Sequence, residues 1–241
     1  MSELKQIKLE TKKHIGQCKF HGKYESLKSK IMGKWVGGKC PTCNEEYEKG
    51  EKKQSRHINP LPKRFRNCTF ESFEKDDNNI TALKYSYNYA NKFQSMLSGG
   101  GSMIFYGTCG TGKTHLASAI ANKIVDDNNG DVLYTKIYDL TGSIKSTWSD
   151  RSITESEAIK QYTDPDLLII DEVGVQFGSE AEQMILFRVL NKRYEDIKPT
   201  IIVSNLDDEG LNKYLGERII DRMYEGGGGK VAFDWQSRRR T

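Results

Sequence analysis

The segment "GTCGTGKT", Gly107–Thr114, matches the pattern GxxxxGK[ST] in full. Its glycines let the backbone turn tightly and direct N–H groups at phosphate oxygens. We expect Lys113 to reach the β- and γ-phosphates and Thr114 to offer its hydroxyl to Mg²⁺. The sequence therefore predicts a site for a nucleoside triphosphate. The residues predicted to contact it are Gly107, Thr108, Cys109, Gly110, Thr111, Gly112, Lys113, Thr114 and His115.

Two adjacent acids follow the apolar run "LLII". Asp171 is predicted to hold Mg²⁺ together with Thr114, and Glu172 to polarise the attacking water as a general base. A solvated strand end is the alternative explanation, but a complete phosphate loop earlier in the chain favours catalysis. Two acids also favour hydrolysis over phosphoryl transfer to a small molecule.

Three more polar residues follow these motifs. Asn205 ends the apolar run "IIVS" and is placed to orient a water molecule. Arg218 and Arg222 lie four residues apart, on one face of a predicted helix. An arginine that reaches the γ-phosphate of a neighbouring subunit would explain them. Ion pairing with Glu217 or Asp221 explains them as well.

Four potential zinc ligands lie near the amino terminus. Cys18-x₂-His21 and Cys40-x₂-Cys43 form two pairs separated by 18 residues. Tetrahedral Zn²⁺ is held by such pairs, each presented by a short turn. So small a segment would need the ion in order to fold. Free thiols and a surface histidine are the alternative.

Alternating elements must position the phosphate site. The apolar runs "SMIFYG", "DVLYTKI", "DLLIID" and "TIIVSN" predict strands, and the last two predict strands buried on both faces. "NNITALKYSYNYANKFQSML", "KTHLASAIANKIV", "YDLTGSIKSTW" and "EAEQMILFRVLNKRYED" predict helices, the first with Asn78 or Asn79 as its cap. The tract Gly226 to Gly229 predicts a loop. The order predicts an α/β fold, a parallel sheet flanked by helices.

Composition and charge limit the class of protein. Hydrophobic residues make up 36% and charged residues 29% of the 241 residues, which indicates a globular chain. No signal peptide and no run of about 18 apolar residues occurs, so we expect a cytoplasmic protein without a membrane partner. Residues 1–66 contain 17 Lys and Arg against 7 Asp and Glu, whereas the remainder contains 20 against 26. This basic front end indicates nucleic acid, an acidic protein face or merely a solvated surface.

The change in composition along the chain predicts three parts. Residues 1–50 are expected to form the zinc-binding, partner-docking module, residues 51–66 a basic linker, and residues 67–241 the ATPase domain. Whether the module binds protein or DNA stays open, because it has few aromatic residues for stacking on bases.

Several segments together resemble one family, the DnaC-type replicative helicase loaders, a branch of the AAA+ P-loop ATPases. They are "RNCTFESF", "GTCGTGKTHLASAI", "LLIIDEVGVQ", "PTIIVSNL", "LGERIIDRM" and "FDWQSRR", between Asn67 and Arg239. The resemblance implies a DNA-stimulated ATPase that binds the hexameric replicative helicase, places it on single-stranded DNA and self-associates through its ATP sites. It implies Arg222 as the arginine finger, Arg218 as the GER-motif arginine, Asn205 as sensor 1 and Arg239 as sensor 2.

The chain departs from the family twice. Its zinc motif is unlike the helical front end of the enterobacterial loaders and similar in kind to that of the Gram-positive loaders, so no helicase-contact residue is carried over. The sequence ends soon after Arg239, so we expect no full helical lid. A compact loader of a phage or prophage fits this build.

Other functions stay open at this point. A transposition helper ATPase of the same branch would bind duplex DNA and a transposase, and its relatives are similar around "RYEDIKPTIIVSN". A non-hydrolysing adaptor would join a zinc module to a nucleotide switch, but it has no chemical need for both acids. A metabolic kinase fits least, because no substrate-binding insertion is visible.

Overall fold

The computed structural model describes residues 11–18, 22–31, 34–37, 40–42, 61–127, 129–149, 152–174 and 179–238. The chain divides into two compact units, Met1–Ser55 and Arg56–Thr241. We call them the N-terminal unit and the P-loop unit. No helix in these ranges is long and apolar enough to cross a membrane.

The described part of the N-terminal unit is an antiparallel sheet. Its strands are β1 (Thr11–Cys18), β2 (Gly22–Ile31) and β3 (Lys34–Gly37), in the order β1-β2-β3. Ile15 and Leu27 lie on one face of the β1–β2 pair and are 69% and 64% exposed. A sheet with its large apolar side chains exposed gains little burial energy by itself.

Two of the four predicted zinc ligands lie in the described part of this unit. Cys18 ends β1, and Cys40 follows β3 and is buried. His21 and Cys43 lie outside the described residues. Within the described residues, no group of three or more His, Cys, Asp or Glu side chains could hold a metal. The zinc site therefore stays a prediction.

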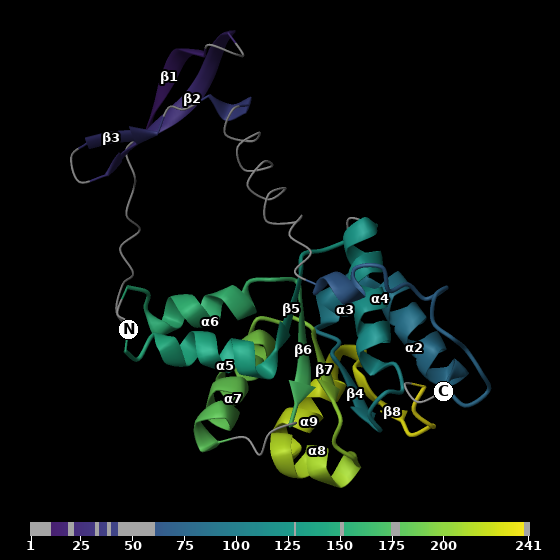
Figure 1. Cartoon of the computed structure of the whole chain (residues 1–241). Helices are drawn as coiled ribbons and strands as arrows, with labels where there is room; N and C mark the ends of the chain where they lie inside the picture. Colours follow the sequence, from purple (N-terminus) through teal and green to yellow (C-terminus); the bar gives the residue numbers. More distant parts are fainter. Residues whose placement is uncertain are drawn as a thin grey trace, which may run out of the picture. The chain divides into compact units, whose positions relative to one another are not determined.

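The described residues of the P-loop unit contain a five-stranded parallel sheet. The strand order is β5-β6-β7-β4-β8. This confirms the predicted fold class (Figure 1). The strands are β4 (Met103–Gly107), β5 (Val132–Lys136), β6 (Leu167–Val173), β7 (Thr200–Ser204) and β8 (Gly229–Phe233).

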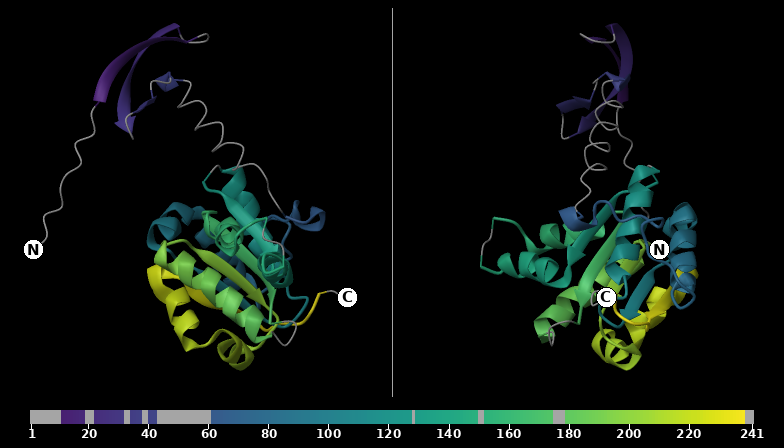
Figure 2. Two further views of the ribbon diagram at one scale, coloured as in Figure 1. Left: turned by 90° about the vertical axis from the view of Figure 1, so that its left-hand side faces the viewer. Right: turned by 45° about the vertical axis from the view of Figure 1, so that its right-hand side comes forward.

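Helices cover both faces of this sheet (Figures 1 and 2). One face carries α2 (Ile80–Asn91), α3 (Phe93–Gly99) and α4 (Lys113–Asp126). The other carries α5 (Ile137–Ser146), α6 (Glu155–Thr163), α7 (Glu180–Glu195), α8 (Asp208–Leu215) and α9 (Glu217–Tyr224). Short 3₁₀ turns occupy Lys63–Phe65 and Glu225–Gly227.

Alternation along the strands creates the two cores. In β6, Leu167 and Ile169 face one helical layer, whereas Leu168 and Ile170 face the other, and all four are fully buried. A strand buried on both sides needs an unbroken apolar run, which is why "LLII" was readable in the sequence.

The first predicted helix differs in detail from the structure. It is interrupted at Lys92, which lies between α2 and α3. Tyr87 of α2 is 44% exposed and packs edge-on against Phe70. Asn79 is at the cap position, but its side chain bonds to the backbone of Glu74 and Asp76 instead of capping the helix.

The tract Gly226 to Gly229 was predicted as a loop, and this prediction is wrong for its last residue. Gly229 begins β8, which pairs with β4 at the edge of the sheet. Gly226 does lie in a tight turn, with a φ of 66°, and a Cβ atom there would collide with the backbone of Gly99. The tract thus carries the chain closely past another segment before the last strand.

A fully buried arginine holds α7 against the sheet. Within the described residues, the Arg193 guanidinium donates six hydrogen bonds of 2.6 to 3.3 Å. These bonds compensate the buried charge of the guanidinium. They also fix the end of α7 relative to β6 and β7, because the acceptors lie just before β6 and at the start of β7. The acceptors are the carbonyl oxygens of Tyr162, Thr163, Pro165, Asp166 and Pro199 and the hydroxyl of Thr200.

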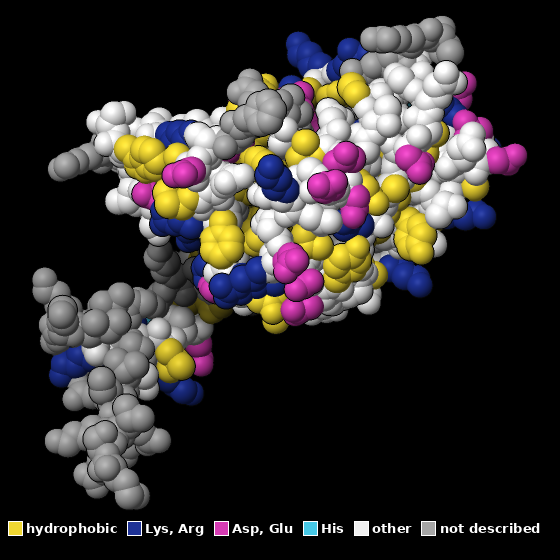
Figure 3. Space-filling model, turned by 90° about the horizontal axis from the view of Figure 1, so that it is seen from below, with side chains coloured by type: hydrophobic (Ala, Val, Ile, Leu, Met, Phe, Trp, Pro, Cys, Tyr) yellow, Lys and Arg dark blue, Asp and Glu magenta, His cyan; other side chains and the backbone are white. Residues whose placement is uncertain are grey.

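Acidic, basic and hydrophobic side chains are interspersed on the face of the P-loop unit that Figure 3 presents. No broad surface of one charge is visible on that face, so the face by itself does not identify a nucleic-acid path.

Candidate nucleotide-binding site

The site lies at the carboxyl ends of neighbouring parallel strands. The phosphate loop follows β4, the acidic pair belongs to β6, and Asn205 follows β7, which lies between them in the sheet. Parallel strands present their carboxyl ends at one edge, where ligands of α/β folds bind. Residues far apart in the sequence thereby meet in one cavity.

That cavity has a volume of about 540 Å³. It contains most of the predicted phosphate-loop residues, both acids and Asn205. The lining residues are Arg64, Phe65, Cys68, Cys109, Gly110, Gly112, Lys113, Thr114, His115, Asp171, Glu172 and Asn205.

Two glycines of the loop have no substitute. Gly107 has a φ of 111°, and a Cβ atom there would lie 2.6 Å from the carbonyl oxygen of Phe233. Gly112 has a φ of 96°, and its Cβ would lie 2.6 Å from the Phe73 ring. Backbone of this handedness is costly for other residues, so the loop shape depends on glycine.

The lysine of the loop lies inside the turn. Lys113 is 4% exposed, and its ammonium donates to the carbonyl oxygens of Gly107 at 2.7 Å and Thr108 at 2.6 Å. Lys113 also begins α4, whose amino-terminal end attracts anions. A phosphate bound there can meet a positive charge, backbone N–H groups and the helix dipole together.

Asp171 receives three hydrogen bonds. Thr114 donates to one carboxylate oxygen at 3.0 Å, and the Tyr134 hydroxyl donates to the same oxygen at 2.5 Å. The other oxygen accepts the backbone N–H of Glu172 at 2.7 Å. Burial and the neighbouring Asp171 raise the pKa of Tyr134, so its hydroxyl remains a donor. One carboxylate and one hydroxyl thus share an oxygen-rich corner suited to Mg²⁺.

Glu172 is held beside the cavity in an unusual conformation. Its φ is 62°, and its carboxylate accepts a hydrogen bond of 2.9 Å from Lys136 at the end of β5. This hydrogen bond to Glu172 raises the pKa of Lys136. The carboxylate can act as a general base once it turns from Lys136 towards a water molecule.

Tyr134 and Lys136 were not predicted as site residues. The alternation of "VLYTK" could place Tyr134 on a buried strand face, but nothing in the sequence pairs β5 with β6. Their contacts with the two acids follow from strand order alone.

Two segments hold the phosphate loop from outside. Nε2 of His115 lies 2.9 Å from the carbonyl oxygen of Thr69. The His115 side chain thus contacts the segment before α2 and also lines the cavity. Trp235 donates its indole N–H to the Thr111 carbonyl at 3.0 Å. The backbone N–H of Arg238 bonds to Gly110 at 3.1 Å. Arg239, the predicted sensor 2, lies outside the described residues.

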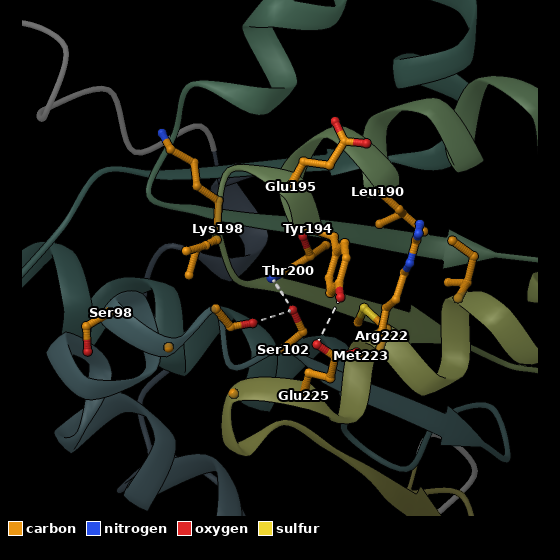
Figure 4. A pocket seen from close by; sticks show the side chains of 15 residues that line it. Ser98, Ser102, Leu190, Tyr194, Glu195, Lys198, Thr200, Arg222, Met223 and Glu225 are labelled. Carbon is orange, nitrogen blue, oxygen red and sulfur yellow. Dashed lines mark hydrogen bonds between the residues drawn. The ribbon is translucent and has the colours of Figure 1, made fainter.

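The two arginines of α9 do not line this cavity. Arg218 is exposed, and Arg222 lines a different cavity of about 450 Å³ (Figure 4). No carboxylate of the described residues forms a salt bridge with either arginine, so the ion pairs with Glu217 or Asp221 are absent there.

Comparisons agree with this geometry. The profile of the family described as "IstB-like ATP binding protein" matches residues 63–224. The chain is 38% identical over 177 residues to the replicative helicase loader DnaC of Buchnera aphidicola from Acyrthosiphon pisum, covering 73% of this chain and 70% of that protein. It is 34% identical over 183 residues to DnaC of Escherichia coli K12, covering 76% and 72%.

A solved structure of a DnaC helicase loader has the same fold. It superimposes with a TM-score of 0.64 at 22% identity, covering 72% of this chain and all of that one. The chain therefore belongs to the IstB-like ATP-binding proteins, and its P-loop unit is an AAA+ ATPase domain of the DnaC-like type.

Proposed function

We propose that this protein is an ATP-dependent loader that binds the hexameric replicative helicase and helps to deliver it onto single-stranded DNA. One observation carries the proposal: the chain is 34% to 38% identical to proteins named replicative helicase loader DnaC over 177 to 183 residues, which is 73% to 76% of its length. Most of the residues predicted to bind phosphate and Mg²⁺, together with the predicted general base Glu172, line one cavity, which supports ATP hydrolysis.

In this proposal each site residue has one task. Lys113 and the loop N–H groups bind the triphosphate, while Thr114 and Asp171 would hold Mg²⁺, which neutralises phosphate charge. Glu172 accepts a proton from the attacking water, and Asn205 orients that water. The Lys136 contact restrains Glu172, and we expect DNA binding to release this restraint and so stimulate hydrolysis.

Arg222 would act on the ATP of a neighbouring subunit. Its place in a separate cavity, without a carboxylate partner among the described residues, supports action in trans. ATP would thereby assemble the subunits, and hydrolysis would release them and free the helicase.

The N-terminal unit would dock on the helicase. Exposed Ile15 and Leu27 on one sheet face support a protein partner. The zinc ligands proposed to hold this unit together are Cys18, His21, Cys40 and Cys43.

The test is co-elution of the purified protein with the replicative helicase of its host in ATP and Mg²⁺. The comparison variant lacks residues 1–55, because Leu61 is only 1% exposed in the core of the P-loop unit and should be retained. Co-elution that is lost on this truncation supports a loader whose N-terminal unit docks. An active ATPase that never co-elutes contradicts the proposal.

A second candidate is a transposition helper ATPase of the same branch, whose relatives are similar around "RYEDIKPTIIVSN". Its signature would be ATP-driven oligomers on duplex DNA, with no helicase contact. A gel-shift assay with single-stranded and duplex oligonucleotides of equal length separates the two functions. Undetectable turnover with either DNA would instead favour a non-hydrolysing adaptor.

A further inference from the structure

The cavity around Arg222 lies between α3, α7 and α9, away from the nucleotide site (Figure 4). The guanidinium of Arg222 lies over the Tyr194 ring, with 4.5 Å between its central carbon and the ring centroid. Its Nη1 also donates a hydrogen bond to Asn191 Oδ1. Both partners come from α7 and are uncharged.

Uncharged partners matter for a residue that must meet phosphate. A carboxylate would neutralise the guanidinium and compete with the incoming anion. An aromatic face and an amide oxygen instead orient the plane of the guanidinium while its full positive charge is kept.

Two acids line this cavity, and both are directed to groups other than Arg222. Glu195 Oε1 accepts a hydrogen bond of 2.7 Å from Asn191 Nδ2. Glu225 lines the same cavity, and its Oε2 accepts a hydrogen bond of 3.0 Å from the Tyr194 hydroxyl. Tyr194 thus supports the guanidinium with its ring and engages the carboxylate with its hydroxyl.

The platform itself is rigid. Tyr194 follows Arg193, whose six hydrogen bonds within the described residues fix the last turn of α7. Lys198 closes this helix end with a backbone hydrogen bond of 2.8 Å to the Arg193 carbonyl. The position of the Tyr194 backbone is therefore set by the core of the domain.

We propose that Tyr194, supported by Asn191, is a positioning residue that presents Arg222 to the ATP of a neighbouring subunit. This inference rests on the proposed function, because it requires Arg222 to act in trans.

The experiment measures single-stranded-DNA-stimulated ATP hydrolysis of the full chain, together with ATP binding. Arg222→Ala should lower kcat by roughly a thousandfold or more and leave ATP affinity unchanged. Tyr194→Leu should lower kcat by roughly three- to thirtyfold with an unchanged KM, the range expected for loss of a cation–π contact. Tyr194→Phe keeps the ring and should retain most of the turnover.

Mixing experiments identify the subunit on which Tyr194 acts. A Lys113→Ala chain has a defective ATP site and an intact Arg222, so adding it should restore turnover to both Arg222→Ala and Tyr194→Leu. Tyr224→Leu is the matched control, because this tyrosine is on α9 and 50% exposed. It should behave like the unaltered protein.

The outcomes separate the inference from the function. Wild-type turnover of Tyr194→Leu beside a defective Arg222→Ala overturns the positioning role alone. The positioning role is also overturned if Lys113→Ala chains restore the turnover of Arg222→Ala but not that of Tyr194→Leu. Wild-type turnover of Arg222→Ala overturns the trans role of Arg222 and the inference with it.

Discussion

At the scale of single residues, charge is placed where a triphosphate needs it. Lys113 supplies the buried positive charge, and Asp171 supplies the oxygen that Thr114 and Tyr134 hold in place. Glu172 is kept near the cavity by Lys136. Lys113 and Asp171 are therefore oriented before the ligand binds, whereas Glu172 must leave Lys136 before it can act.

Lys113→Ala should weaken ATP binding by at least about tenfold. A hydrogen bond to a charged group contributes roughly 1.5–3 kcal/mol, and this residue supplies the only ammonium lining the described cavity. Fluorescence titration with a labelled ATP analogue measures it. Lys123→Ala, on the surface of the same helix in a pair with Asp127, should bind normally. An unchanged affinity for Lys113→Ala would refute the assignment of the phosphate site.

At the scale of elements, the phosphate loop depends on two close approaches. The Phe73 ring packs over Gly112, and the Phe233 carbonyl lies against Gly107. These contacts come from segments before α2 and at the end of β8. The loop is therefore shaped by its neighbours as much as by its own glycines.

Gly112→Ala should distort the loop and lower both thermal stability and ATP affinity. The left-handed backbone alone costs roughly 1–2 kcal/mol with a side chain, and Phe73 must also move. Gly142→Ala is the control, because this glycine lies in α5 and its Cβ would meet no atom within 4 Å. That control should raise stability by about 0.5–1 kcal/mol. Thermal melts with and without ATP measure both, and a Gly112→Ala chain as stable and as tightly binding as the unaltered protein would contradict this account.

At the scale of the whole molecule, two units divide the work in the proposed function. The P-loop unit has two buried cores, one on each side of its sheet. The described N-terminal sheet exposes large apolar side chains, so we expect a metal, a partner or both to contribute to its stability.

The purified full chain should contain about one zinc ion per molecule, since four ligands complete one tetrahedral site. Cys40→Ser should lose the zinc and the helicase complex while it retains ATP binding. Cys68→Ser, in the P-loop unit, should keep the zinc and the helicase complex. Elemental analysis by mass spectrometry together with co-elution checks this. Zinc that persists in Cys40→Ser would remove Cys40 from the ligand set.

The sequence by itself determined the chemistry of the nucleotide site. The residues of the phosphate loop are contiguous, and their spacing carries the physical requirement for a tight turn before a helix. Asp171 and Glu172 were readable because an unbroken apolar run marks a buried strand and an acid marks its end. The parallel α/β fold followed from the alternation of strands and helices.

Only the tertiary structure decided which residues support that chemistry. Tyr134 and Lys136 reach the acids because β5 pairs with β6, and the turn before β8 passes close to Gly99 because Gly226 has no side chain. The partners of Arg222 come from a helix about thirty residues away, whereas the sequence offered either a neighbouring subunit or ion pairing with Glu217 or Asp221 of its own helix. Contacts between distant segments depend on strand order and helix packing, which are global properties that local residue patterns do not encode.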